Sequence, residues 1–585
     1  MRHFYTDLIR DPRRVRLTFV ASLSWFDSLE PSLRVWLRSK MEPLTLESGQ
    51  QLFAAGSPSD CLFLVTRGAL GAFAGEQLVG QVVAGETVGE LGLVTKRPRT
   101  ASVRALRDSA LLRLSPEGFD ALCRTHPEAV LALARVVLDR AQRPIHQRLA
   151  AHPRTIALLP QNDGLHLDAF AKWLAEALGG ESKVAIVRRE DSPTDDALDS
   201  LERDRAFVIY LAPPEADAWR RRCLRQADAL VFVAESQPCA DWCELERGVH
   251  APLPRPEHLV VMHKHDVPPG TGRTWKEKRP LAQLHHCRGA GDAPRIARII
   301  SGEPRGIVLS GGGARGFAHL GVLRALEEAK VPIDVVGGAS IGAIIGAGFA
   351  AGWSLSEMTQ VYRASFIASD PLSDWTLPLV SLVGGRSVSR LLEEAYGRRD
   401  IEDLARPYFC VSTNLTAGRS VVHRSGRVWK WLRASAAIPG VLPPVFHGGQ
   451  VLVDGGVMNN LPVDVMRDGL VADVIAVDIG ADDAVLGPSK LEEFELPSIW
   501  RVIWDWLTGT RRPSLAKLML GSGMVNSTAA TFAARAASSL VLTPPVSDID
   551  LLDFESFDVA VERGYQSTLY ALDDLSPSPL GRGSG

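Results

Sequence analysis

Short apolar segments alternate with polar residues and glycines through the first quarter of the chain, from about residue 15 to residue 150. Residues 44–93 carry several such segments, each only a few residues long and separated by a glycine-bearing turn. This pattern is typical of short strands in a small β-roll or barrel. Residues 118–149 then read as helices, and Ser115-Pro116-Glu117 has the residue types of a helix start. We therefore expect a β-roll closed by helices.

The pattern changes between residues 153 and 300, where continuous apolar runs alternate with helical stretches. Strand and helix in strict alternation predict an α/β layer with a mostly parallel sheet. A third unit, again α/β, is expected from residue 304 to about residue 570, with buried strands at 409–415, 451–456 and 473–480. Residues 576–585, rich in Ser, Pro and Gly, have the composition of a flexible tail. The chain is thus predicted to be multidomain.

Composition limits the possible functions without choosing one. The 585 residues are 46% hydrophobic and 23% charged, as in ordinary globular proteins, and the net charge of −3 gives no electrostatic signature for nucleic acid. Seven scattered cysteines do not form a disulfide framework, which favours a reducing compartment, the cytoplasm. Cys239, Cys243 and residues 285–287 fit none of the common zinc spacings, so no metal site is expected. The N-terminus resembles neither a signal peptide nor a membrane anchor.

Residues 336–352, VGGASIGAIIGAGFAAG, support two interpretations. No charged side chain occurs from Val335 to Ser356, and several GxxxG spacings suit a membrane-spanning helix. The alternative is a nucleophile turn, because Gly338, Ser340 and Gly342 form a G-x-S-x-G between a strand and a helix. The dominance of Gly and Ala over bulkier residues favours the second interpretation. It predicts a buried stretch in which only the serine reaches a cleft.

Two further segments supply partners for such a serine. Residues 311–316, GGGARG, follow an apolar strand and precede a helix, so their backbone N–H groups are expected to converge on an anion. Their G-x-G-x-x-G spacing also fits a dinucleotide site, but the nearby serine favours an oxyanion hole. No histidine follows His447, whereas Asp454 ends an apolar strand and precedes two glycines. Asp454 is therefore either the base of a Ser/Asp dyad or an ordinary turn aspartate.

These three segments, in this order, resemble the patatin-like phospholipases, and residues 433–445 and 454–466 are similar to that family as well. The resemblance implies hydrolysis of lipid acyl esters with Ser340 as nucleophile and Asp454 as general base, without a catalytic cofactor. It assigns the remaining site residues to an oxyanion loop of Gly311, Gly312, Gly313, Arg315 and Gly316, a nucleophile turn flanked by Gly338 and Gly342, and a D-G-G segment completed by Gly455 and Gly456.

A second candidate site lies in residues 88–103. Glu90 and Arg99 have the residue types that bind a ribose hydroxyl and a phosphate, although a charged surface loop explains them equally simply. The segment resembles the phosphate-binding cassette of cyclic nucleotide-binding domains, which implies that Gly89, Glu90, Arg99 and Thr100 contact cAMP or cGMP. Val88 and Gly92 depart from the residues usual in that cassette.

The order of the three units resembles the neuropathy target esterase proteins. We therefore expect a serine esterase acting on lysophospholipid or phospholipid acyl chains, with cyclic nucleotide as a regulator. The alternative is a cyclic-nucleotide-responsive scaffold with a silent hydrolase fold. Residues 496–520 group tryptophans and apolar residues ahead of two arginines, which suits either a helix over the active site or peripheral contact with a membrane.

Overall fold

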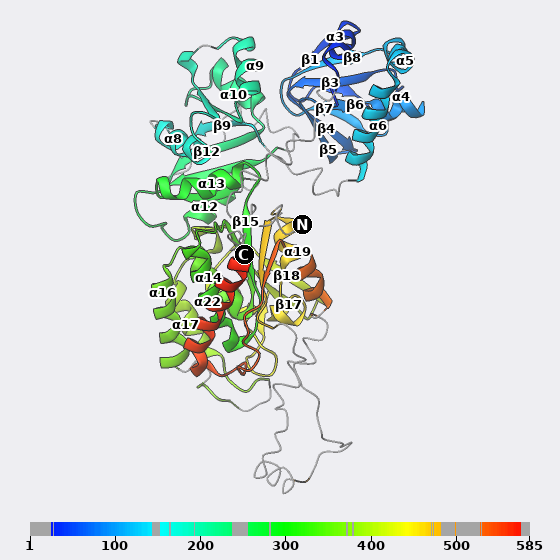
Figure 1. Ribbon diagram of the computed structural model, residues 1–585. Coiled ribbons are helices and arrows are strands. Elements are labelled where there is room, and N and C mark those ends of the chain that lie inside the picture. The colour runs from blue at the N-terminus through cyan, green and yellow to red at the C-terminus, as the bar shows by residue number, and fades with distance from the viewer. Residues whose placement is uncertain are drawn as a thin grey trace, which may run out of the picture. The chain divides into compact units, whose positions relative to one another are not determined.

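The computed structural model (Figure 1) describes residues 25–26, 29–142, 153–162, 165–191, 193–236, 255–279, 282–369, 373–376, 380–469, 471, 473–480, 498, 527 and 529–574. The flexible tail expected at 576–585 and the tryptophan-rich helix expected at 496–520 lie outside these residues, apart from residue 498. The chain divides into two compact units, residues 3–266 with 275–303 and residues 267–274 with 304–585.

The first unit begins with the expected β-roll, which is built from two four-stranded antiparallel sheets. Its helices start as the sequence indicates: the Ser115 side chain accepts a hydrogen bond from the Gly118 N–H and Pro116 opens the helix. The first sheet contains β1 (Met41–Leu46), β8 (Ser109–Leu114), β3 (Leu62–Arg67) and β6 (Thr87–Val88); the second contains β2 (Gln51–Phe53), β7 (Ser102–Ala105), β4 (Ala69–Ala74) and β5 (Gln77–Val83); the helices are α3 (Pro31–Ser39), α4 (Glu90–Thr95), α5 (Pro116–Thr125) and α6 (Pro127–Gln142).

The same unit contains a six-stranded sheet in which every strand pair is parallel, which confirms the α/β prediction for residues 153–300. Apolar clusters cover both faces, as a fully parallel sheet requires. In sheet order the strands are β10 (Val184–Val187), β11 (Phe207–Leu211), β9 (Thr155–Pro160), β12 (Ala229–Glu235), β13 (Glu257–Met262) and β14 (Gln283–Cys287); the helices are α8 (Asp168–Ala177), α9 (Asp195–Asp204), α10 (Ala218–Gln226) and α13 (Ala293–Ile300), with short 3₁₀ turns η1 (Arg189–Asp191) and η2 (Ala290–Asp292). Helix α12 (Thr271–Lys278) begins in the second unit and ends in the first.

Strand β14 carries the histidines that the sequence offered as zinc ligands. His285 lies 3.1 Å from His258 of β13, ring nitrogen to ring nitrogen, and His286 lies 2.8 Å from His263 in the same way. Burial lowers the pKa of His258 to about 4, so this pair stays neutral at physiological pH. Among the described residues no group of three or more potential ligands could hold a metal ion, and Cys239 and Cys243 lie outside them.

The second unit is built on a mixed eight-stranded sheet. In Figure 1 helices α14, α16, α17 and α22 gather on one side of this sheet and α19 lies on the other. The strands run β19 (Val445–His447), β20 (Gln450–Asp454), β17 (Tyr408–Asn414), β16 (Val335–Ala339), β15 (Arg305–Leu309), β21 (Asp473–Val477) and β22 (Leu540–Leu542), with β18 (Arg419–His423) beside β17; the helices are α14 (Ala318–Glu328), α15 (Ser340–Ala351), α16 (Leu355–Arg363), α17 (Arg386–Tyr396), α18 (Val428–Ser435), α19 (Val463–Asp468) and α22 (Phe557–Asp574); the short turns are η3 (Gly313–Phe317), the π-helical η4 (Ala364–Ala368), η5 (Ile401–Asp403), η6 (Gly455–Val457) and η7 (Phe554–Ser556).

Residues 336–352 form the end of β16 and all of α15, and every residue from 335 to 350 is buried. A Cβ on Gly342 would lie 2.4 Å from the Leu309 carbonyl oxygen, and one on Gly338 would lie 2.8 Å from the Gly342 backbone. Glycine is therefore required where the start of α15 crosses the neighbouring strands. The buried-helix interpretation is confirmed, but the expectation that only the serine reaches a cleft is wrong, because Ile341 and Ile344 of α15 line the pocket beside Ser340 as well. Among the described residues no helix is long and apolar enough to cross a membrane.

Candidate active site

Ser340 occupies the turn between β16 and α15 with a backbone φ of +52°. A non-glycine residue at positive φ is strained, and such strain is concentrated at functional sites. The turn places the serine at the first position of α15, at the carboxyl end of a parallel strand. This is the strand, turn and helix geometry that the G-x-S-x-G pattern predicts.

Asp454 ends β20, which pairs with β17, and it faces the serine. The Ser340 hydroxyl donates to Asp454 Oδ2 at 2.7 Å, and the Gly456 N–H donates to Oδ1 at 2.7 Å. Burial raises the pKa of Asp454 to about 6, while these two hydrogen bonds act in the opposite direction. Because a base works best when its pKa lies near the working pH, the raised pKa suits Asp454 to accept the serine proton. The structure thus brings together two residues that are 114 apart in sequence.

The glycine loop runs from the end of β15 into η3. The Gly311 N–H donates to the side-chain oxygen of Asn460 at 3.1 Å. No hydrogen bond from the N–H of Gly312 or Gly313 to a described residue is present. Gly313 has a φ of +56°, and a Cβ there would lie 2.1 Å from the Leu551 carbonyl oxygen. That contact permits only glycine at this position.

The remaining residues predicted for the oxyanion loop and the D-G-G segment contact neighbouring parts of the same unit. The Arg315 guanidinium donates to the carbonyl oxygens of Ile549 at 2.7 Å and Ser547 at 2.5 Å, so it fastens the loop to the C-terminal segment. A Cβ on Gly316 would lie 2.3 Å from the Ile341 side chain. In the D-G-G segment, a Cβ on Gly455 would lie 2.3 Å from the Val411 carbonyl oxygen, which again requires glycine.

The end of α18 and the residues that follow it hold both Ser340 and Asp454 in place. The Ser340 N–H donates to the Ser435 hydroxyl at 3.0 Å, and that hydroxyl donates to the Val411 carbonyl at 2.7 Å. Two residues later the Ala437 carbonyl accepts the Asp454 N–H at 2.9 Å. Sequence reasoning assigned no role to this segment, although residues 433–445 were part of the family resemblance. Ser435 and Asn460 were missed because a buried Ser or Asn has no spacing pattern of its own.

No histidine hydrogen-bonds to Ser340 or Asp454 among the described residues. His319 is buried and its Nε2 lies 2.9 Å from the Ser310 carbonyl oxygen, at the base of the glycine loop. Burial lowers the pKa of His319 to about 4, so the ring is neutral and supports the loop. His447 lies on β19 against Trp431, with 5.0 Å between ring centroids.

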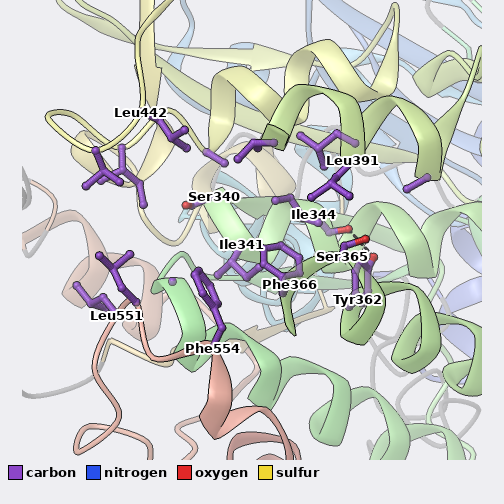
Figure 2. A pocket seen from close by; sticks show the side chains of 18 of the residues that line it. Ser340, Ile341, Ile344, Tyr362, Ser365, Phe366, Leu391, Leu442, Leu551 and Phe554 are labelled. Atoms are coloured by element: carbon purple, nitrogen blue, oxygen red, sulfur yellow. Dashed lines mark hydrogen bonds between the residues drawn. The ribbon is translucent and has the colours of Figure 1, made fainter. Parts of the chain in front are cut away.

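An apolar pocket adjoins Ser340 (Figure 2), and its empty space, including the part open to solvent, is about 810 Å³. In Figure 2 two groups of side chains flank Ser340. Leu442 and Leu551 lie on one side of it, and Ile344, Leu391 and Tyr362 lie on the other. The remaining lining side chains are mostly aliphatic or aromatic and come from α15, α16, η4, α17 and residues 436–442 and 551–554. Such a lining suits a hydrocarbon chain.

The segment predicted to bind a cyclic nucleotide lies in the β-roll, but the guanidinium of its arginine already donates hydrogen bonds to backbone carbonyl groups. Gly89 adopts a φ of +92° at the start of α4, Glu90 and Arg99 are buried, and Thr100 is exposed. The Arg99 guanidinium donates to the carbonyl oxygens of Gly89 and Cys61, both at 2.8 Å, and lies 4.2 Å from the centre of the Phe53 ring. Asp60 Oδ1 lies 3.6 Å from Nη2, and Nε has no hydrogen-bond partner among the described residues. A phosphate that bonds both Nη groups would therefore compete with the two carbonyl groups and with Asp60.

Residues 307–467, which contain the serine turn, the glycine loop and Asp454, match the patatin-like phospholipase family model. Residues 194–293 match the neuropathy target esterase (NTE) family P-loop like domain. An uncharacterized NTE family protein of Mycobacterium tuberculosis is 32% identical over 554 residues, which cover 92% of this chain and 93% of that protein. The chain belongs to the NTE family.

Relatives in this NTE family extend beyond bacteria. Human patatin-like phospholipase domain-containing protein 6 is 30% identical, and the match covers 89% of this chain but 44% of that protein. The protein named lysophospholipase NTE1 of Mycosarcoma maydis is 28% identical, with 93% of this chain and 34% of that protein covered. Residues 43–126 match the cyclic nucleotide-binding domain model, in agreement with the β-roll. The family resemblance found in the sequence is confirmed.

We predict that Ser435→Ala lowers kcat of ester hydrolysis about tenfold and leaves KM nearly unchanged, because it removes a hydrogen bond worth on the order of 1 kcal/mol that orients the nucleophile. Ser435→Thr, which keeps the hydroxyl, should recover much of the loss. Ser538→Ala is a matched control, since it removes a hydroxyl bonded to a backbone carbonyl elsewhere in the same unit. Steady-state kinetics tests this, and a rise in KM at unchanged kcat would contradict it.

Proposed function

We propose that this NTE family member is a serine esterase that hydrolyses the acyl ester bond of a lipid, with Ser340 as nucleophile and Asp454 as general base. The observation that carries the proposal is the 2.7 Å hydrogen bond from the serine hydroxyl to the buried carboxylate, at the side of an apolar pocket. A nucleophile bonded to a base, beside free backbone amides, is the arrangement that acyl transfer requires.

In the first half-reaction the Ser340 hydroxyl oxygen attacks the ester carbonyl carbon while its proton passes to Asp454 Oδ2. The carbonyl oxygen becomes an oxyanion, which the Gly312 and Gly313 N–H groups stabilise. Collapse of this intermediate breaks the ester C–O bond, and the proton on Asp454 passes to the leaving alcohol. Water then attacks the acyl-enzyme, again giving a proton to Asp454. Collapse of the second tetrahedral intermediate breaks the bond from the serine oxygen to the acyl carbon, Asp454 returns the proton to that oxygen, and the fatty acid leaves.

We infer that the substrate is a lysophospholipid or phospholipid. The apolar pocket supports an acyl chain, and the fungal relative is named a lysophospholipase. The scaffold alternative would leave Ser340 without a chemical role, yet the serine occupies a strained conformation beside a buried carboxylate. Backbone strain and a buried acid both destabilise a fold, so their presence favours catalysis over a silent fold.

We predict that the purified protein releases fatty acid from 1-palmitoyl lysophosphatidylcholine. Ser340→Ala and Asp454→Asn should each lower kcat/KM by about a thousandfold or more, since each removes an essential part of one catalytic unit. Ser389→Ala on α17 is a control, because that hydroxyl bonds a helical carbonyl outside the pocket. Fatty acid release measured by mass spectrometry decides the question. A folded wild-type protein that releases none, with either lysophospholipid or phospholipid, would support the scaffold alternative.

The pKa of Asp454, which burial raises to about 6, sets an expected pH dependence. Because the base must be deprotonated in the free enzyme, kcat/KM should rise with pH, reach half its maximum near pH 6 and stay level above pH 7. Below this pKa the rate should fall about tenfold per pH unit. A profile that remains flat down to pH 4 would contradict Asp454 as the base.

We further propose that the β-roll binds a cyclic nucleotide and that binding exchanges the two carbonyl acceptors of Arg99 for the phosphate. The match to the cyclic nucleotide-binding domain and the burial of Glu90 and Arg99 in one short segment support this proposal. The exchange costs two charge-assisted hydrogen bonds, so the affinity should be modest.

We predict that titration calorimetry with cAMP or cGMP detects binding that Arg99→Ala abolishes. Arg104→Ala is the matched control, because Arg104 lies on β7, five residues after Arg99, is partly exposed and faces Glu76 at 3.9 Å. Unchanged binding by Arg99→Ala, or no heat with either nucleotide, would show that the cassette serves only to stabilise the β-roll.

A further inference from the structure

The pocket beside Ser340 has one open end and one closed end. Leu552 lines the pocket and is 42% exposed, which marks the open end. At the other end Tyr362 of α16 and Tyr396 of α17 line the pocket and are fully buried. Behind them Trp353 stacks on the Tyr396 ring at 5.0 Å and does not line the pocket, so the two tyrosines form its end wall.

This end wall is fixed by hydrogen bonds to the helix that carries the nucleophile. The Tyr362 and Tyr396 hydroxyls lie 2.8 and 2.7 Å from the Ile344 carbonyl oxygen of α15, and 3.1 Å from each other. The Tyr362 hydroxyl also sits over Gly348, where a Cβ would lie 2.3 Å away. Ile344 is one helical turn beyond Ser340, about 6 Å along the axis, so the distance from nucleophile to wall is set within one rigid helix.

We propose that the two tyrosines, with Ser365 beside them, form an acyl-chain gauge that limits the length of the chain the enzyme hydrolyses. This inference rests on the proposed esterase function. The ester carbonyl lies at Ser340, the leaving group faces the open end at Leu552, and the acyl chain runs along α15 towards the tyrosines. A chain that reaches the wall cannot displace it without breaking the hydrogen bonds to Ile344.

The π-helical turn η4 contains a position at which a substitution would change the space beside the end wall. Ser365 and Phe366 of this turn line the pocket, and Ser365 lies beside Tyr362 in Figure 2. Ser365 is small and partly buried, so a larger side chain there would occupy space next to the wall. Ala364, its neighbour in the same turn, is exposed and does not line the pocket. A large side chain at Ser365 would both fill the pocket and disturb the turn, whereas the same side chain at Ala364 would disturb only the turn. Comparing the two variants therefore isolates the effect of filling the pocket.

The test compares kcat/KM for monomeric p-nitrophenyl butanoate, octanoate and palmitate. In Ser365→Phe the ratio of palmitate to butanoate should fall about tenfold or more relative to wild type, the range expected for crowding a hydrophobic pocket. Ala364→Phe should keep the wild-type ratio. If Ser365→Phe does not fold, as judged by circular dichroism, Ala395→Leu on the facing helix α17 fills the same end and should shift the ratio in the same direction.

The outcomes separate this inference from the function on which it rests. Wild-type protein that hydrolyses none of the esters would overturn the proposed function. Wild-type hydrolysis with an unchanged chain-length ratio in the folded Ser365→Phe variant would overturn the gauge and leave the esterase in place. An equal shift in Ala364→Phe would also overturn it, since the effect would then come from the helical turn and not from the pocket.

Discussion

The hydrogen bond between the Ser340 hydroxyl and Asp454 is the interaction on which the architecture of the proposed catalytic unit depends. Both side chains are short and buried, so the positions of their backbones set the 2.7 Å distance between the serine hydroxyl and the carboxylate. Ser340 is held by the turn from β16 to α15, and Asp454 by the pairing of β20 with β17. The segment containing Ser435 and Ala437 ties the two backbones together. Burial then raises the pKa of Asp454 to about 6, which suits the carboxylate to the proposed role of general base.

Close backbone approach is the cost of this arrangement, and it explains the unusual composition of the site. Gly342, Gly313 and Gly455 each lie where a Cβ would come within 2.4 Å of a carbonyl oxygen. The lack of charge in residues 336–352 therefore follows from close packing around Ser340. Helix α15 serves two purposes, since it presents Ser340 at its first residue and supplies the carbonyl that fixes the closed end of the pocket.

Much of the fold was predictable because its signals are local. Buried parallel strands read as continuous apolar runs, and the serine turn and Asp454 lie at strand ends that the sequence marks with glycines. Strand β14 gives a weaker signal in the sequence, because two histidines interrupt its apolar run. The role of the C-terminal segment was not predictable either, since Arg315 meets the Ile549 carbonyl across 234 residues and through backbone atoms that carry no sequence signal. For the same reason the backbone acceptors of Arg99 escaped prediction.

The most direct test of the account is the reaction of the protein with a fluorophosphonate, which labels a serine only when a base activates it. Peptide mass spectrometry should find one phosphonyl group per chain, on Ser340, and Asp454→Asn should slow the labelling at least about a hundredfold. Labelling of another serine, or an unchanged rate in the folded Asp454→Asn variant, would contradict the Ser340/Asp454 dyad.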